Sequence, residues 1–258
     1  MNVLDKIIND KKLEVEERSR ITPIERIKDS QRLYSIRDFN GKLKNKGLQI
    51  IAEIKRRSPS EGDINIHADP PKIAKSYAKN GAACISILTD RQYFGGQLEF
   101  IQLVKAVVDI PILRKDFIIS EYQVWETFHS GADAILLIAD VIEEQLMKDL
   151  YQLASNLGLH VLVEMHQLKY LKMINDLGPK IVGVNCRDLK TMDVDINYFE
   201  KIVTDLPKEA TWVAESGMNN ISVLEYVSKL GFHSALVGSF LMKSNDPGMV
   251  LSQLQNIS

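Results

Sequence analysis

The chain has 258 residues, of which 45% are hydrophobic and 26% charged, a composition that excludes a disordered or fibrous protein. A formal net charge of −2 lacks the basic excess of a nucleic-acid-binding domain, so we expect no nucleic-acid partner. Two cysteines, Cys84 and Cys186, are too few for a disulfide framework or a usual zinc site, and we expect reduced thiols.

The N-terminal segment carries no targeting signal that we recognise. It is charged throughout, with acidic residues from Asp5 onward, which a secretory signal does not tolerate. The longest strongly apolar run, Ala134–Ala139, is far shorter than the ~20 residues that cross a bilayer. We therefore expect a cytoplasmic protein without a membrane partner.

Residues 1–45 precede the first strand and predict an N-terminal helical extension. Val3, Leu4, Ile7 and Ile8 recur at helical spacing and are followed by the mixed-charge stretch KKLEVEER. Two placements are open. The extension either seals one end of the fold as an amphipathic helix or covers the catalytic end.

Eight short runs rich in Ile, Val and Leu follow, and each precedes a longer amphipathic stretch. The runs are Gln49–Ile54, Ala83–Leu88, Ile110–Leu113, Ala134–Ile138, His160–Val163, Ile181–Val184, Trp212–Ala214 and Ala235–Val237. Such near-continuous apolar runs are typical of parallel strands covered on both faces. Their spacing predicts an α/β protein in which residues 1–258 form one (β/α)8 TIM barrel domain with the N-terminal helical extension. A doubly wound sheet is the alternative, because periodicity does not report closure.

The stretches between the runs predict helices with recognisable ends. They are Pro71–Asn80, Glu121–Ser130, Glu143–Leu157 and Ile221–Leu230. Each is followed by glycine at or next to its end. Ser120 and Asn220 stand where an N-cap residue is expected.

Charged and amide side chains gather where the predicted strands end, which in a barrel is the active-site end. They are Glu53, Lys55, Lys115, Glu164, Asn185, Arg187 and Glu215. Alternation along a strand places Glu53 and Lys55 on one face and Ile54 toward the helices. Each group has a plainer interpretation, such as an ion pair between Glu164 and His166. Several acids and bases at one end are costly to bury, however, unless they are paired or used.

Small residues end the last two strands and predict a phosphate site. They are Ser216, Gly217, Gly238 and Ser239, and they precede a segment that can begin a short helix. Barrels often bind phosphate here through backbone N–H groups, and glycine allows close backbone approach. Two tight turns are the alternative. The loop Arg56–Gly62 is long enough to act as a flap.

No metal or nucleotide cofactor is expected. None of the five histidines has metal-ligand spacing, and no nucleotide-binding fingerprint occurs. Three of them, His129, His160 and His233, lie within predicted helices or strands and are expected to be structural. The remaining chemistry is acid–base catalysis by lysine and glutamate on a phosphorylated small molecule.

The order of motifs resembles that of the indole-3-glycerol phosphate synthase family over essentially the whole chain. The motifs are IIAEIKRRSPSEGDI, SILTDRQYFGGQLEF, LRKDFII, VLVEMH, VGVNCRDLKTMDVD, WVAESGM and ALVGSFLM. The resemblance implies a (β/α)8 barrel that converts 1-(2-carboxyphenylamino)-1-deoxyribulose 5-phosphate to indole-3-glycerol phosphate in tryptophan biosynthesis, with loss of CO₂ and water.

The same resemblance implies roles for individual residues. Lys115 would be the general acid in ring closure and Glu164 the base in dehydration. Lys55 would hold the substrate carboxylate, although the division of roles between the two lysines stays open. Positioning roles would fall to Glu53, Asn185 and Glu215. The substrate-binding set would comprise Ser58, Phe94, Phe117, Leu136, Arg187, Ser216, Gly217, Gly238 and Ser239.

The sequence also leaves several points open. Cys186 and Ser239 depart from the family, which often has Asn and Glu there. Burial and mutual repulsion would lower the pKa of the lysines, but the glutamates oppose this, so the net direction is undecided. A monomer is favoured, but the oligomeric state is not determined. Rival functions are another phosphate-binding barrel, such as a ketose–aldose isomerase or a Schiff-base aldolase, and a barrel that only binds its ligand.

Overall fold

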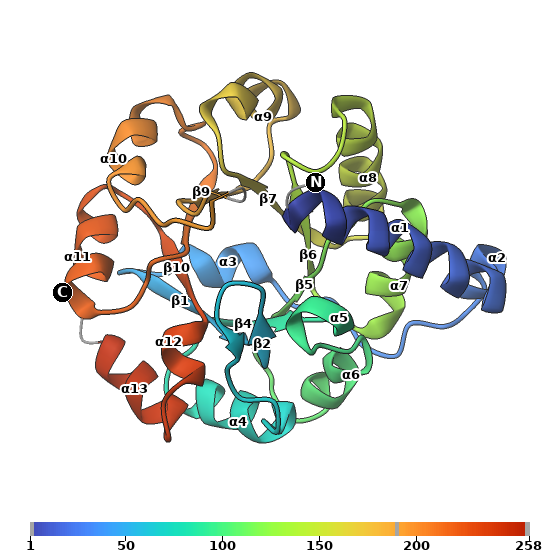
Figure 1. The fold of residues 1–258 in the computed structure, drawn as a ribbon, viewed down its shortest axis with the longest axis horizontal. Helices are drawn as coiled ribbons and strands as arrows, with labels where there is room; N and C mark the ends of the chain where they lie inside the picture. The colour runs from blue at the N-terminus through green and yellow to red at the C-terminus, as the bar shows by residue number, and fades with distance from the viewer. Residues whose placement is uncertain (1–2, 189–190, 256–258) are drawn as a thin grey trace.

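Eight parallel strands close into a barrel in the order β1–β10–β9–β8–β7–β6–β5–β4, with helices around it (Figure 1). The strands are β1 (Gln49–Ile54), β4 (Cys84–Leu88), β5 (Ile112–Lys115), β6 (Ala134–Ile138), β7 (His160–Met165), β8 (Ile181–Asn185), β9 (Thr211–Glu215) and β10 (Ser234–Val237). Closure by pairing of β1 with both β4 and β10 confirms the predicted barrel and excludes the doubly wound sheet. This computed structural model describes residues 3–188 and 191–255, so both ends of the predicted 1–258 domain lie outside the described ranges.

Helices connect the strands and extend the chain at its N-terminus. They are α1 (Val3–Ile21), α2 (Ile24–Lys28), α3 (Phe39–Leu43), α4 (Pro70–Lys79), α5 (Arg91–Phe94), α6 (Glu99–Lys105), α7 (Glu121–Ser130), α8 (Glu144–Asn156), α9 (Leu171–Leu177), α10 (Tyr198–Ile202), α11 (Ile221–Lys229), α12 (Ser239–Met242) and α13 (Pro247–Leu254). Two 3₁₀ turns are η1 (Leu168–Tyr170) and η2 (Val203–Asp205). The loop after β1 forms a small antiparallel hairpin of β2 (Arg57–Ser58) and β3 (Gly62–Asp63).

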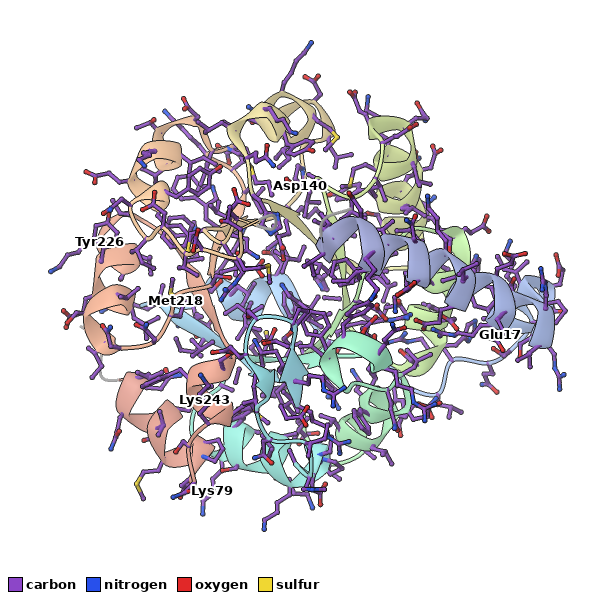
Figure 2. All side chains as sticks on the ribbon, in the orientation of Figure 1. Glu17, Lys79, Asp140, Met218, Tyr226 and Lys243 are labelled. Carbon is purple, nitrogen blue, oxygen red and sulfur yellow. The ribbon has the colours of Figure 1, made fainter. Side chains whose placement is uncertain are left out.

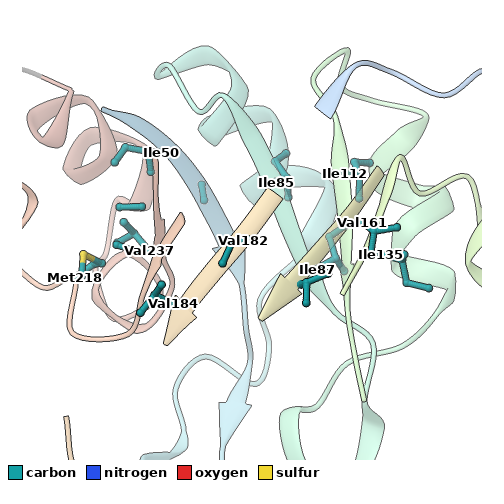
Figure 3. Close-up of a cluster of buried hydrophobic side chains, with 14 of the residues drawn as sticks. Ile50, Ile85, Ile87, Ile112, Ile135, Val161, Val182, Val184, Met218 and Val237 are labelled. Atoms are coloured by element: carbon teal, nitrogen blue, oxygen red, sulfur yellow. The ribbon is translucent and has the colours of Figure 1, made fainter. Parts of the chain in front are cut away.

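The strands bury apolar side chains on both faces, as their composition predicts. Outward-facing residues such as Ile50, Ile85 and Ile112 belong to the large cluster between strands and helices (Figure 3). Ile54 belongs to the same cluster, so it points toward the helices as predicted, whereas Ile51 belongs to a second cluster inside the barrel. Alternation along each strand thus leaves the inward positions at the strand ends for polar side chains.

Most predicted strand and helix ends differ from the structure by one or two residues, and one predicted helix cap is wrong. β5 begins at Ile112 rather than Ile110, because Pro111 has no N–H group to donate to a neighbouring strand. Ser120 precedes α7, but its side chain accepts no hydrogen bond from the helix. Its hydroxyl lies 3.3 Å from Oε1 of Gln123 instead. Asn220 does cap α11, accepting a 3.0 Å hydrogen bond from the backbone N–H of Val223.

The N-terminal extension occupies both ends of the barrel, so each of the two expected placements describes one part of it. Phe39 and Leu43 of α3 are fully buried in the interior cluster. Asn40, also in α3, accepts a 2.7 Å hydrogen bond from the hydroxyl of Thr211 at the start of β9. This helix therefore seals the end of the barrel at which the strands begin.

Helix α1 lies at the opposite end, where it crosses near α7 in Figure 1. Its Lys11 is 1% exposed, and its ammonium lies 2.8 Å from Asp90 and 3.0 Å from Asp116. Asp90 follows β4 and Asp116 follows β5, so this ion pair network joins the extension to the carboxyl ends of two strands. A buried lysine between two buried carboxylates fixes α1 there.

Replacing Lys11 by Met is expected to lower the free energy of unfolding by about 3–5 kcal/mol, because the buried Asp90 loses its counterion and the buried Asp116 keeps only Arg114 as a cationic partner. Urea unfolding monitored by circular dichroism measures the change. The matched control is Lys12→Met, in which the neighbouring lysine is exposed. Equal losses in the two variants would contradict the anchoring role of Lys11.

Candidate active site

A cavity of about 330 Å³ opens at the carboxyl ends of the strands, a volume within the usual range for small-molecule sites. Every residue that the sequence analysis assigned to the site lines it. These residues are Glu53, Lys55, Ser58, Phe94, Lys115, Phe117, Leu136, Glu164, Asn185, Arg187, Glu215, Ser216, Gly217, Gly238 and Ser239. Seven of the barrel strands contribute to this set, either directly or through the residues that follow them. The eighth strand, β4, contributes through Phe94 in the helix α5 that follows it.

Lys115 is held between two carboxylates at the centre of the cavity. It ends β5, and its ammonium lies 2.7 Å from Oε2 of Glu164 on β7 and 2.5 Å from Oε2 of Glu215 on β9. Burial lowers the pKa of Lys115, but Glu164, Glu215 and Glu53 outweigh burial and raise it above its ordinary value. The sequence left the direction of the lysine pKa shift open, and the structure shows that the pKa of Lys115 is raised. Lys115 is therefore a cation at neutral pH.

The two carboxylates that share Lys115 have opposite protonation preferences. Burial and the nearby Glu164 raise the pKa of Glu215 to about 8. Burial also raises the pKa of Glu164, but Lys115 and His166 outweigh it and hold the pKa well below its ordinary value. Asn185 on β8 adds a 3.1 Å hydrogen bond from its amide to Oε1 of Glu164. The two pKa values are shifted in opposite directions, so Glu164 ionises more readily than Glu215.

Glycines make room for the buried carboxylates. A Cβ atom on Gly183 of β8 would lie 2.3 Å from Oε1 of Glu215, and one on Gly238 would lie 2.2 Å from Oε1 of Glu53. Gly238 was expected for close backbone approach to an anion, but the structure gives this second reason for it. Glu53 in turn lies 3.0 Å from the ammonium of Lys55, as their shared face predicts.

One wall of the cavity is aromatic and apolar. The rings of Phe94, after β4, and Phe117, after β5, lie with their centroids 6.2 Å apart and are tilted by 41°. Leu136 of β6 is buried, belongs to the apolar cluster inside the barrel and also lines the cavity. This wall lies at the β4–β6 side of the barrel, next to Lys115.

The predicted phosphate loops follow β9 and β10. Ser216 has φ 68° and Gly217 has φ 72°, so two successive residues adopt the left-handed region, which is unusual for a serine and is often found at functional sites. Ser239 begins the short helix α12, and its hydroxyl donates a hydrogen bond to Glu61 at the tip of the β2–β3 hairpin. The ammonium of Lys243 lies 2.7 Å from the same carboxylate.

Sequence reasoning missed Glu61 and Lys243. Figure 2 labels Lys243, at the lower left of the barrel mouth. A lysine one turn into the helix expected after the eighth strand was the available signal for a further anion-binding group. Ser58 accepts a 3.2 Å hydrogen bond from the backbone N–H of Glu61, so it also shapes the hairpin.

His166 and Asp140 were not assigned to the site either. The ring of His166 lies between Glu164 and Asp140, 3.2 Å from the first carboxylate and 3.1 Å from the second. The sequence analysis named the Glu164–His166 contact only as the alternative to a functional Glu164. The structure contains that contact together with the Glu164–Lys115 ion pair, so the two interpretations are compatible.

Three further observations concern the chain as the structure describes it. Within residues 3–188 and 191–255, no cluster of three or more His, Cys, Asp or Glu side chains is arranged to hold a metal ion. Over the same ranges, no helix has the length and apolar character needed to cross a membrane. Cys84 and Cys186 are both free and buried.

Two solved structures illustrate the similarity of the fold to known barrels. A 3-hexulose-6-phosphate synthase from Salmonella typhimurium superposes with a TM-score of 0.67 at 13% identity, covering 81% of this chain and 98% of that one. A thiamine phosphate pyrophosphorylase from Pyrococcus furiosus superposes with a TM-score of 0.63 at 16% identity, covering 83% and 96%. At these identities the likeness shows the fold alone.

Sequence comparison is far more specific. The profile of a family described as indole-3-glycerol phosphate synthase matches residues 4–254. A protein of that name from Thermoanaerobacter pseudethanolicus is 43% identical over 244 residues, covering 95% of this chain and 94% of the relative. One from Listeria welshimeri is 40% identical over 255 residues, covering 99% of both chains. The chain belongs to the indole-3-glycerol phosphate synthase family, as its motifs, its barrel and its assembled site together indicate.

Proposed function

We propose that this chain closes the indole ring of 1-(2-carboxyphenylamino)-1-deoxyribulose 5-phosphate, releasing CO₂ and water to form indole-3-glycerol phosphate. The observation that carries the proposal is the position of Lys115, whose ammonium lies between Glu164 and Glu215 in a cavity that also contains an aromatic wall and the loops predicted to bind phosphate. Such a cavity suits a substrate with an aromatic ring at one end and a phosphate at the other.

Lys115 acts at the substrate carbonyl in this proposal. Attack of the aromatic ring carbon on the C2 ketone forms a carbon–carbon bond and develops negative charge on the ketone oxygen. The Lys115 ammonium stabilises that charge and supplies the proton. Its raised pKa keeps it protonated before each turnover, although burial opposes this. Loss of CO₂ then returns the electron pair of the breaking C–C bond to the ring.

Glu164 acts as the base in the later loss of water. It takes a proton from the substrate, the electron pair of that bond forms the new double bond, and the hydroxyl group departs as water with a proton from an acid. Glu215 suits a proton-donating or hydroxyl-binding role, because burial and Glu164 raise its pKa to about 8. Two carboxyl groups whose environments separate their pKa values in this way commonly divide the acid and base roles.

The remaining residues hold the two ends of the substrate. Lys55 binds the carboxylate on the aromatic ring of the substrate. Glu53 and Asn185 orient the two lysines and the hydroxyl groups of the substrate. Arg187 is held in place by a 2.9 Å hydrogen bond to the carbonyl of Met192 and faces the substrate from the loop after β8. The substrate ring lies against Phe94, Phe117 and Leu136. The phosphate is bound by Ser58, Ser216, Gly217, Gly238 and Ser239.

Glu61 competes with the phosphate for Ser239 and Lys243 in this arrangement. Glu61→Gln is therefore expected to lower the inhibition constant of inorganic phosphate by about two- to fivefold, the range of an exposed ion pair. Steady-state inhibition at several substrate concentrations measures it. Glu209→Gln is the matched control, because this exposed carboxylate precedes β9 at the opposite end of the barrel. An inhibition constant that stays unchanged or rises would place the phosphate elsewhere.

The decisive experiment is incubation of the purified chain with the carboxyphenylamino-deoxyribulose phosphate while indole fluorescence is followed. Appearance of the indole signal supports the proposal. Binding without turnover would indicate a barrel that only binds its ligand, and covalent trapping of a lysine by borohydride with substrate would indicate a Schiff-base aldolase.

The same proposal covers the setting of the enzyme. We infer one barrel domain over residues 1–258 with residues 1–45 as its extension, working as a monomer in the cytoplasm on a phosphorylated small molecule. The free, buried thiols of Cys84 and Cys186 support a reducing compartment. Gel filtration with light scattering tests the monomer.

A further inference from the structure

We propose that His166, oriented by Asp140, is a positioning residue that keeps the catalytic base Glu164 ionised and correctly directed; this inference rests on the proposed function. His166 directly follows β7 and lies two residues beyond Glu164. Its Nε2 atom is 3.2 Å from Oε1 of Glu164, and its Nδ1 atom is 3.1 Å from Oδ2 of Asp140. Figure 2 labels Asp140 at the upper rim of the barrel mouth.

The imidazole ring is held in one orientation by the loop after β6. Oδ2 of Asp140 accepts a 3.0 Å hydrogen bond from the backbone N–H of His166 as well as contacting its ring. The other oxygen, Oδ1, accepts a 3.3 Å hydrogen bond from the side chain of Gln167. Asp140 therefore fixes both the backbone and the ring at the end of β7, and the second ring nitrogen is directed at Glu164.

A ring between two carboxylates in a buried position is most stable as a cation. The side chains of His166, Asp140 and Glu164 are 2%, 4% and 3% exposed. Burial lowers the pKa of His166, but the two carboxylates outweigh burial and raise it to about 9. The contact with Glu164 is ionic rather than a well-aligned hydrogen bond. It places a positive charge beside Oε1, on the side away from Lys115.

Three other strands supply the remaining groups around Glu164, whose burial opposes its ionisation. Lys115 from β5 contacts Oε2, and the amide of Asn185 from β8 contacts Oε1. Glu215 from β9 shares Lys115, and its carboxyl group also helps to lower the pKa of Glu164. Around Asp140, the other titratable neighbour is Tyr198 of α10, whose pKa burial and Asp140 raise to about 12, so it stays neutral. His166 is thus the second cation at Glu164, beside the shared lysine.

His166→Gln removes this cation while retaining a polar side chain of similar reach. The pKa of Glu164 then rises, so the base form is lost at a higher pH than in the unmodified enzyme. We expect the acidic limb of the kcat–pH profile to move upward by about one unit or more, the effect of a charge at this distance. Asp140→Asn, which leaves His166 in place, is expected to shift the limb in the same direction by less.

The matched control is His160→Gln, the same substitution at the other end of the same strand. His160 begins β7 and faces Asp38 at 3.7 Å, so this variant is expected to leave the profile unchanged. A fall in kcat that is equal at every pH in His166→Gln and Asp140→Asn would show a merely structural role and overturn the proposal.

A spectroscopic measurement keeps this test separate from the proposed function. ¹⁵N NMR of labelled imidazoles at pH 8 should show a doubly protonated histidine that disappears in His166→Gln and persists in His160→Gln. Absence of that signal in the unmodified protein would overturn the proposal whether or not the enzyme turns over. Failure of the unmodified protein to form the indole product, with the signal present, would instead contradict the proposed function.

Discussion

Lys115→Met is expected to lower kcat by at least about a thousandfold while substrate still binds. General acid catalysis is typically worth about 10²- to 10⁴-fold, and a fixed cation at a developing alkoxide adds to it. Methionine keeps most of the apolar stem, so the packing beneath the ammonium is retained. The ammonium lies 2.7 Å from Glu164 and 2.5 Å from Glu215, and among the described residues no other cationic side chain forms an ion pair with both carboxylates.

Single-turnover kinetics with quenched samples resolved by mass measure this effect, because they separate binding from ring closure. Circular dichroism on the same samples checks the fold. Lys55→Met is the comparison, since Lys55 pairs with Glu53 at 3.0 Å rather than with Glu164 and Glu215. If Lys115→Met stays within tenfold of the unmodified enzyme while Lys55→Met abolishes ring closure, the roles of the two lysines are reversed.

Glu164→Gln is expected to slow dehydration by about 10²- to 10⁴-fold, the usual contribution of a general base. Ring closure and decarboxylation depend on Lys115 and should proceed first. A decarboxylated intermediate that is heavier than the product by one water molecule should therefore accumulate in quenched single-turnover samples. Its appearance and slow decay, measured by mass spectrometry, report directly on the step that Glu164 serves.

Glu215→Gln provides the matched comparison on the same ammonium. Because burial and Glu164 raise the pKa of Glu215, its carboxyl group is more readily protonated than that of Glu164, and glutamine is the closer replacement for it. This variant is expected to lose less activity than Glu164→Gln at pH 7. The opposite ranking, or the absence of any accumulated intermediate in Glu164→Gln, would assign the base to another residue.

The placement of the site could be read from the sequence because it depends on local patterns. Apolar runs with alternating faces determine strands, and strands in a parallel barrel bring their carboxyl ends together. Glu53, Lys115 and Glu164 each end or closely precede the end of such a run, so their meeting in one cavity followed from the fold class. The resemblance to the family then suggested their individual roles.

Contacts between distant segments could not be read in this way. Asp140 is 26 residues from His166, and Glu61 is 178 residues from Ser239, and neither pair has a spacing that marks it in the chain. The two expected placements of the N-terminal extension were also equivalent in sequence. Helical spacing of apolar residues predicts that a face is buried but not which end of the barrel buries it.

The sequence by itself thus determined the barrel, the strand ends and the chemical types that meet there, because these follow from periodicity and composition. The tertiary structure decided the charge states within the site. Lys115 lies 49 residues from Glu164 and 100 from Glu215, yet the sign of its pKa shift depends on distances of less than 3 Å between their charged atoms. Coulomb energy depends on separation in space and on burial, and both are properties of the folded chain alone.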